Sequence, residues 1–252
     1  MKKINSVTAK FCLWILVISL VLIVAFLLLQ KDVKILNETR VALIDKIGNN
    51  YVFRGNNPFI IKDGKMIFAY DEITSYFNKI LTKKGEKPLD DYYLIDVSLL
   101  DIDQYFVIKK EEEFFAQHPK NGELINFSTL SISLLLGKFP HSNIVNKSLN
   151  DYNLWVSDRL KQIYELASKQ TNKTVIVYIH CNSGRDRTGL MITGYRLLFN
   201  NMPLRETRIM DLKEAQRSSV ASYDEAIRSY CKYVKKTYNK PDDYCAYFNS
   251  PN

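Results

Sequence analysis

A ten-residue segment late in the chain carries the residue types that phosphate chemistry requires. It spans residues 180–189 and reads His-Cys-Asn-Ser-Gly-Arg-Asp-Arg-Thr-Gly. A free cysteine, with a pKa of about 8.5, is a poor nucleophile, but backbone N–H groups and the positive end of a helix dipole stabilise its thiolate. A thiolate can attack phosphorus to give a covalent phosphocysteine, which splits one difficult hydrolysis into two easier steps. Cys181 is therefore the predicted nucleophile.

The residues after this cysteine suit the binding of a phosphoryl group. The guanidinium of Arg187 can hold two phosphoryl oxygens at once, and more tightly as charge shifts during transfer. Gly184 permits a backbone conformation that turns amides inward, and Thr188 can offer its hydroxyl to the sulfur when the sulfur leaves. The predicted phosphate-binding set is completed by Asn182, Ser183, Arg185 and Asp186. The alternative is a structural turn around a buried free cysteine.

The segment lies between a predicted strand and a predicted helix. Residues 174–179 form a nearly continuous, β-branched apolar run, which is typical of a strand buried on both faces. Apolar residues recur at helical spacing over 155–167 and over 189–199. A loop that runs from the carboxyl end of a central strand into a helix N-terminus gathers N–H groups and positive dipole at one spot. We expect that spot to bind oxyanions.

The rest of the chain predicts the same kind of domain. Further strands are expected over 51–54, 92–97 and 124–127, and further helices over 73–81, from Pro203 onward and over 223–238. Strands alternating with helices indicate an α/β fold in which helices flank a central sheet.

The 180–189 segment resembles the signature of the cysteine-dependent tyrosine and dual-specificity phosphatase superfamily: His-Cys, five residues, Arg and Ser or Thr. Its Asp-Arg-Thr-Gly ending is most similar to microbial and lipid-acting branches. Tyr51–Gly55 is loosely similar to a Tyr-Arg-Ser-Gly stretch of microbial members, with Gly55 where they carry serine. The resemblance implies a dual-specificity phosphatase-like fold, a mechanism that needs no metal or cofactor, and a supporting role for His180 in orienting the cysteine.

The resemblance also implies an aspartate that protonates the leaving oxygen. In the compact members this residue lies about thirty residues before the cysteine, where this chain has Asp151. Two alternatives stay open. Ser148–Asp151 also reads as a helix start, at which an aspartate caps backbone amides. Asp186 is the second candidate donor, or else it forms an ion pair that orients Arg185 or Arg187.

An apolar run near the N-terminus predicts a membrane anchor. Residues 11–29 contain one non-apolar residue, Ser19, and as a helix they would extend about 28 Å, close to the thickness of a bilayer core. A cleaved signal peptide is the alternative, although the run is long and lacks a small-x-small site. Lysines and arginines on both sides of the run leave its orientation open. We expect a single-pass membrane protein.

These segments give a domain scheme. We expect a basic tail at 1–10, a transmembrane anchor at 11–30, a linker at 31–50, a phosphatase domain at 51–240 and a C-terminal tail at 241–252.

The net charge of the chain limits the kinds of partner that we expect. The formal charge of +8 suits an anionic partner, such as a phosphorylated protein, a phosphoinositide or a membrane surface. Nucleic acid is not expected, because no nucleic-acid motif accompanies the Lys and Arg residues, which are spread along the chain.

Cys231 and Cys245 could form a disulfide or remain thiols. His118 and His141 stand alone in polar surroundings, and no ligand spacing predicts a metal site.

The sequence thus predicts a membrane-anchored phosphatase that hydrolyses phosphomonoesters through a phosphocysteine, acting on phosphotyrosine or as a dual-specificity protein phosphatase. Three alternatives remain: a phosphoinositide phosphatase, a phosphate-binding pseudophosphatase adaptor, and a redox or sulfur-transfer enzyme such as an arsenate reductase.

Overall fold

The computed structural model of the chain describes residues 12–21, 33–128 and 143–246. Within them, a five-stranded sheet has the order β1-β2-β7-β5-β6. Its strands span Ala42–Ile47 (β1), Asn50–Asn56 (β2), Tyr92–Ser98 (β5), Gly122–Asn126 (β6) and Thr174–Cys181 (β7). Four of them run parallel, and β1 pairs antiparallel to β2 at one edge. A separate hairpin joins Phe59–Lys62 (β3) and Lys65–Phe68 (β4).

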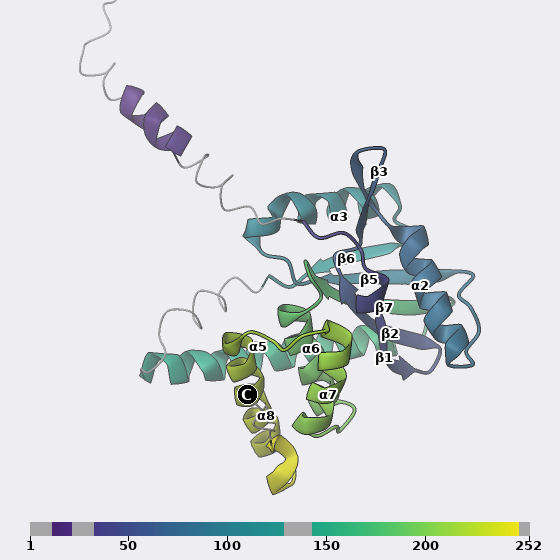
Figure 1. Cartoon of the computed structure of the whole chain (residues 1–252), viewed down its shortest axis with the longest axis vertical. Coiled ribbons are helices and arrows are strands. Elements are labelled where there is room, and N and C mark those ends of the chain that lie inside the picture. Colours follow the sequence, from purple (N-terminus) through teal and green to yellow (C-terminus); the bar gives the residue numbers. More distant parts are fainter. Residues whose placement is uncertain (1–11, 22–32, 129–142, 247–252) are drawn as a thin grey trace, which may run out of the picture.

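Helices cover both faces of this sheet (Figure 1). One face carries α2 (Tyr70–Lys83) and α3 (Tyr105–Gln117), and the other carries α5 (Asn143–Ser168), α6 (Asp186–Leu198), α7 (Leu204–Ala215) and α8 (Ala221–Thr237). Short 3-10 turns occur at Glu38–Arg40 (η1), Ile102–Gln104 (η2) and Asp242–Cys245 (η3). The predicted strands and helices coincide with these elements apart from their ends, so the α/β architecture with a flanked central sheet is confirmed.

The central strand β7 divides its side chains between the two faces. Val177, Ile179 and Cys181 pack in the core formed with α5, α6 and α8, whereas Tyr178 packs in the core formed with α2 and α3. This follows from the strand period, because successive side chains point to opposite faces. Cys181 therefore lies on the α6 side of the sheet, and His180 lies on the α3 side.

The segment before residue 51 is built into the same domain. Residues 33–50 lie within the predicted linker, and they contain η1 and the edge strand β1. The backbone N–H of Leu36 donates to the carbonyl of Phe59 (2.7 Å). Leu36 and Val41 are buried in the core beneath α2 and α3.

The prediction of an N-terminal transmembrane helix is wrong for the part of the chain that the structure describes. Of the predicted anchor 11–30, residues 12–21 are described and helical. No helix in the described ranges is both long and apolar enough to cross a membrane. The inferred single-pass location is corrected with it. Residues 1–11 and 22–32 lie outside the described residues.

The two cysteines near the C-terminus are joined. Cys231 in α8 and Cys245 in η3 form a disulfide with an S–S distance of 2.04 Å, which settles the alternative that the sequence left open. The free cysteines of the described chain are Cys12, which is exposed, and Cys181, which is buried.

Candidate active site

The 180–189 segment forms a tight connection between β7 and α6. Cys181 is the last residue of β7, and α6 begins five residues later at Asp186. Burial by itself raises the pKa of the Cys181 thiol. The charge of Arg187, the hydroxyl and amide of Thr188 and the amide of Arg185 outweigh burial, so the net pKa lies below the ordinary value. The Cys181 thiol therefore ionises more readily than a free cysteine.

The guanidinium of Arg187 is oriented by the loop that follows β5. Its Nη1 donates to the carbonyl of Leu99 (2.9 Å) and lies 3.3 Å from Oδ2 of Asp101, while Nη2 donates to Oε1 of Gln104 (2.8 Å). The hydroxyl of Ser128 donates to the other Asp101 oxygen (2.8 Å). Asp101 is 5% exposed. A carboxylate held beside the phosphate-binding arginine can take part in proton transfer.

The sequence reasoning missed Asp101 and Gln104. One signal could have identified these two residues. They come shortly after the strand predicted over 92–97, and the carboxyl ends of parallel strands meet at one edge of a sheet. The structure shows this meeting, because β5 pairs with β7 and Ser98 lies opposite His180.

The two aspartates that the sequence offered as proton donors lie elsewhere. Asp151 is exposed on α5, and among the described residues no hydrogen bond or ion pair joins it to Cys181 or Arg187. It is not a helix cap either, because α5 begins at Asn143.

Asp186 holds a neighbouring segment. One of its oxygens pairs with Arg217 (2.6 Å), and the other accepts the backbone N–H of Val220 (3.1 Å) at the start of α8. The ion pair expected for Asp186 is therefore present, but with Arg217 and not with Arg185 or Arg187.

Two glycines allow the loop to lie against β2. Gly184 has φ of +62°, a conformation that favours glycine, and a Cβ there would overlap the carbonyl of Gly55. At Gly55, where the resembled family carries serine, a Cβ would overlap the hydroxyl of Tyr178. The departure from the family pattern thus has a packing cause.

Arg54 anchors the loop from beneath. It is fully buried, donates to the carbonyl of Gly184 (2.6 Å), and pairs with Asp211 (2.7 Å) and Glu214 (2.8 Å) of α7. These contacts tie β2, the loop and α7 together, and they neutralise the buried cation.

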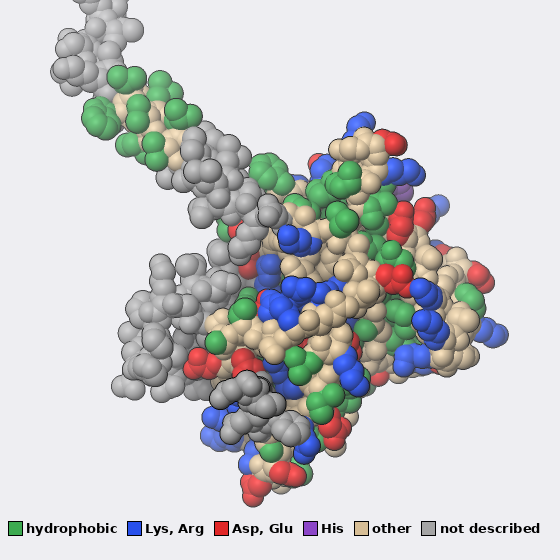
Figure 2. Space-filling view, in the orientation of Figure 1, with side chains coloured by type: hydrophobic (Ala, Val, Ile, Leu, Met, Phe, Trp, Pro, Cys, Tyr) green, Lys and Arg blue, Asp and Glu red, His purple; other side chains and the backbone are tan. Residues whose placement is uncertain are grey.

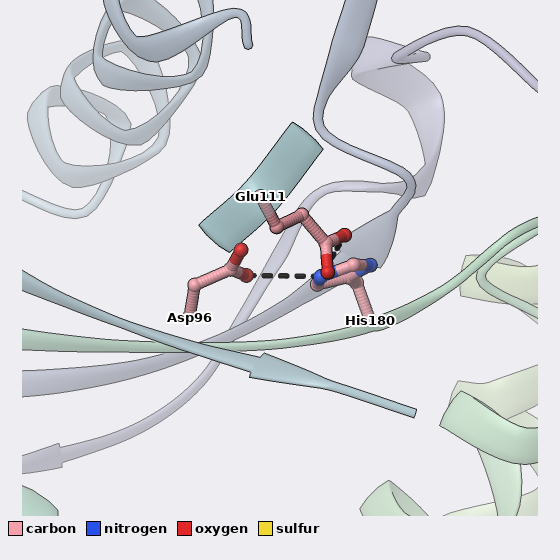
Figure 3. A group of neighbouring side chains, drawn as sticks. All are labelled: Asp96, Glu111 and His180. Atoms are coloured by element: carbon pink, nitrogen blue, oxygen red, sulfur yellow. Dashed lines mark ion pairs between the residues drawn. The ribbon is translucent and has the colours of Figure 1, made fainter. Parts of the chain in front are cut away.

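His180 joins a buried cluster on the opposite face of the sheet (Figure 3). Its Nε2 lies 2.9 Å from Oδ1 of Asp96 on β5 and 3.5 Å from Oε1 of Glu111 on α3, and all three side chains are fully buried. Burial lowers the pKa of His180, but attraction to Asp96 and Glu111 outweighs burial and raises the pKa to about 9. The imidazole is therefore a cation at neutral pH, one residue from Cys181.

Glu111 completes the charge balance of the cluster. Burial is the largest influence on Glu111 and raises its pKa. The charge of His180 lowers this pKa and the charge of Asp96 raises it, which gives a net value of about 8. A protonated Glu111 beside a charged His180–Asp96 pair avoids an uncompensated buried charge. The ligand atoms of the three residues lie within 4.8 Å of one another, close enough for a metal ion. The ion pair between His180 and Asp96 explains the same cluster, because the imidazolium of His180 supplies the positive charge.

This cluster predicts a fall in stability as pH rises. The folded-state pKa values of Glu111 and His180, about 8 and 9, exceed their ordinary values of 4.5 and 6.5, so the folded chain binds these protons more tightly. This stabilisation is complete below the ordinary pKa values and is lost as the pH rises through the folded-state values. Urea unfolding at pH 6 to 9 should show this fall, and Glu111→Gln should flatten it.

Glu113→Gln, an exposed change on the same helix, serves as the control and should leave the slope unchanged. Equal slopes in wild type and Glu111→Gln would contradict the prediction.

A segment near the N-terminus forms one wall of the loop. The N–H of Lys34 donates to Oδ1 of Asn182 (2.8 Å), and the side chains of Asn56 and Asn57 donate to the carbonyls of Ile35 (2.7 Å) and Lys34 (3.1 Å). A pocket of about 110 Å³ lies at this junction, lined by Lys34, Ile35, Asn37, Arg40, Asn56, Ser183 and Arg185.

Comparison with known proteins adds a distant likeness. No family model and no curated protein matches the chain. Among solved structures, PTPMT1 is 17% identical with a TM-score of 0.42, over 78% of this chain and 98% of that one. The Siw14 catalytic core is 17% identical with a TM-score of 0.41, over 83% and 96%. Tk-PTP in its active form is 12% identical with a TM-score of 0.39, over 77% and 97%. Such low similarity supports no inference about activity, so the proposals below rest on the site itself.

Proposed function

We propose that this protein is a cysteine-dependent phosphatase that hydrolyses phosphomonoesters through a phosphocysteine intermediate. One observation carries the proposal: the Cys181 thiol, with a lowered pKa, stands at the carboxyl end of the central strand and at the N-terminus of α6, coupled electrostatically to Arg187. This arrangement combines a nucleophile with an oxyanion-binding site.

The first step transfers the phosphoryl group to sulfur. The Cys181 thiolate forms a bond to phosphorus while the bond from phosphorus to the ester oxygen breaks. Arg187 and the inward amides of the loop hold the three remaining phosphoryl oxygens. The leaving oxygen takes a proton from a carboxyl group, and the alcohol departs.

The second step releases phosphate. A water molecule attacks phosphorus and gives its proton to the same carboxylate, while the phosphorus–sulfur bond breaks and the thiolate returns. The hydroxyl of Thr188, buried beside the sulfur, stabilises the returning thiolate.

We assign the proton-donor role to Asp101. Among the carboxylates of the described residues, Asp101 forms an ion pair with the Arg187 guanidinium (3.3 Å), and the hydroxyl of Ser128 fixes its orientation. In its protonated form, the Asp101 carboxyl supplies the proton that the leaving group needs.

For the substrate class, the sequence predicts a phosphotyrosine or dual-specificity protein phosphatase, or alternatively a phosphoinositide phosphatase. The second candidate gains support from the pocket beside the loop, which is lined by Lys34, Arg40 and Arg185. An adaptor without turnover is separated from both by an activity assay.

Trapping the intermediate tests the proposed function. Acid quenching during turnover of p-nitrophenyl phosphate should leave phosphate on Cys181, located by peptide mass spectrometry. Vanadate should inhibit, because it mimics the five-coordinate phosphorus of the transfer, and EDTA should not. Phosphate found on a hydroxyl or imidazole, or activity lost with EDTA, would refute the cysteine mechanism.

A further inference from the structure

The pocket between the N-terminal segment and the loop is lined by cations without a carboxylate. Three of its seven lining residues are Lys34, Arg40 and Arg185, and the others are uncharged. Figure 2 shows Lys and Arg side chains gathered on the face where the N-terminal segment meets the domain. A concave site lined by one sign of charge attracts the opposite charge.

These cations differ from the other cations around the loop. Arg54 is paired with Asp211 and Glu214, and Arg217 is paired with Asp186. Within the described residues, by contrast, Lys34 and Arg185 form no ion pair, and Arg40 donates to the carbonyls of Glu214 and Ala215. Among the described residues, therefore, no carboxylate neutralises the positive charge of Lys34 and Arg185 in the pocket.

The cations also repel one another. Burial lowers the pKa of Arg40, and the charges of Arg185, Arg54 and Arg217 lower it further. An anion in the pocket would relieve this repulsion. Arg40 is 5% exposed, so its charge is less screened by solvent than that of a surface arginine.

The pocket adjoins the phosphate loop on the side away from Asp101. Ser183 and Arg185 belong to the loop and also line the pocket, whereas Arg187 turns toward the segment after β5. A substrate phosphate at Cys181 would therefore have the cationic pocket as its neighbour across the loop.

We propose that this pocket binds a second phosphate of the substrate, and that the substrate is a polyol carrying at least two phosphates, free or as a lipid headgroup. The inference rests on the proposed phosphatase function. The two sites share Ser183 and Arg185 of the loop, which suits two phosphates carried on one small ring. Neighbouring residues of an extended peptide point their side chains to opposite sides, which suits the shared loop poorly.

Lys34 offers a clean test, because its side chain is exposed while its backbone makes the contacts to Asn182 and Asn57. Rates would be measured with p-nitrophenyl phosphate, an inositol monophosphate, an inositol bisphosphate, a short-chain phosphatidylinositol bisphosphate and a doubly phosphorylated peptide. We expect wild type to favour both bisphosphates over the monophosphate. Lys34→Glu should lower their kcat/KM about tenfold or more, through KM, and leave p-nitrophenyl phosphate within about twofold.

Two further variants complete the test. Lys34→Arg should restore the bisphosphate rates. Lys87→Glu makes the same charge change on an exposed lysine beside Glu86, which contacts Lys46 of β1 and Tyr51 at the start of β2, whereas the pocket lies at the end of β2. This change should affect no substrate selectively. Equal rates for the free and the lipid bisphosphate would show that the enzyme recognises the headgroup alone. A higher rate for the lipid would show that the substrate is the bisphosphate attached to its lipid.

The outcomes separate this inference from the function on which it rests. Wild type that hydrolyses no aryl phosphate would refute the phosphatase function. Hydrolysis of p-nitrophenyl phosphate without preference for bisphosphates would refute the second phosphate site alone. The second phosphate site would also be refuted if Lys34→Glu slowed all substrates equally. It would be refuted as well if Lys34→Glu lowered the rate only for a doubly phosphorylated peptide.

Discussion

Cys181→Ser should abolish turnover of aryl phosphates, lowering kcat by at least about 10⁴-fold, as expected when a covalent nucleophile is removed. A serine hydroxyl in the same place stays protonated under conditions in which the thiol, with its lowered pKa, ionises. Because the side chain is nearly isosteric, the fold and the binding of vanadate should survive. Steady-state kinetics, a melting curve and vanadate titration measure the three quantities.

Cys12→Ser is the matched control, since Cys12 is also a free thiol but is exposed on the 12–21 helix. It should retain wild-type rates. Activity persisting in Cys181→Ser would exclude Cys181 as the nucleophile. Loss of activity in both variants would point to a general requirement for thiols.

The second large effect concerns the proton donor. Asp101→Asn should slow hydrolysis of phosphotyrosine or alkyl phosphates by about 10²- to 10⁴-fold, because general acid catalysis contributes on that order. It should slow an activated ester such as 2,4-dinitrophenyl phosphate much less, because that leaving group needs no proton. The basic limb of the pH profile for kcat should flatten as well. Asp151→Asn, an exposed change on α5, should alter neither substrate.

Asp101 also contacts Arg187, so a purely orienting role needs its own control. Gln104 accepts from the same guanidinium (2.8 Å) but carries no proton to transfer. Gln104→Ala should therefore weaken vanadate binding and slow both esters equally. If Asp101→Asn behaves in the same way, with equal slowing of both esters, Asp101 orients Arg187 and does not donate the proton.

The loop could be predicted from sequence because its determinants are local. The β-branched run over 174–179, the glycine at 184 and the spacing from Cys181 to Arg187 all lie within sixteen residues. Each has a direct structural expression in β7, in the positive φ of Gly184 and in the start of α6. Local pattern and local structure agree here.

The proposed proton donor, Asp101, could not be predicted in this way, because its position depends on strand pairing. Asp101 and Arg187 are 86 residues apart in the chain and meet because β5 lies beside β7. Sequence spacing pointed instead to Asp151, since residues 127–150 contain no Asp or Glu. Spacing carries no information about which strands are neighbours.

The membrane prediction depended on composition alone, a count of apolar residues over 11–29. It is contradicted because no helix of the described chain is long and apolar enough for a span.

The place of β7 in the sheet has a consequence for folding. Among the described strands β7 is the last in the chain, yet it separates β2 from β5 and contributes to both cores. Synthesis at about 5–20 residues per second leaves β5 waiting roughly 4 to 17 s between Ser98 and Cys181. During that time β2 and β5 present strand edges open to other chains. The segment that carries the proposed nucleophile is therefore also the one whose synthesis completes the sheet, and a ribosome stalled before it would hold an aggregation-prone chain.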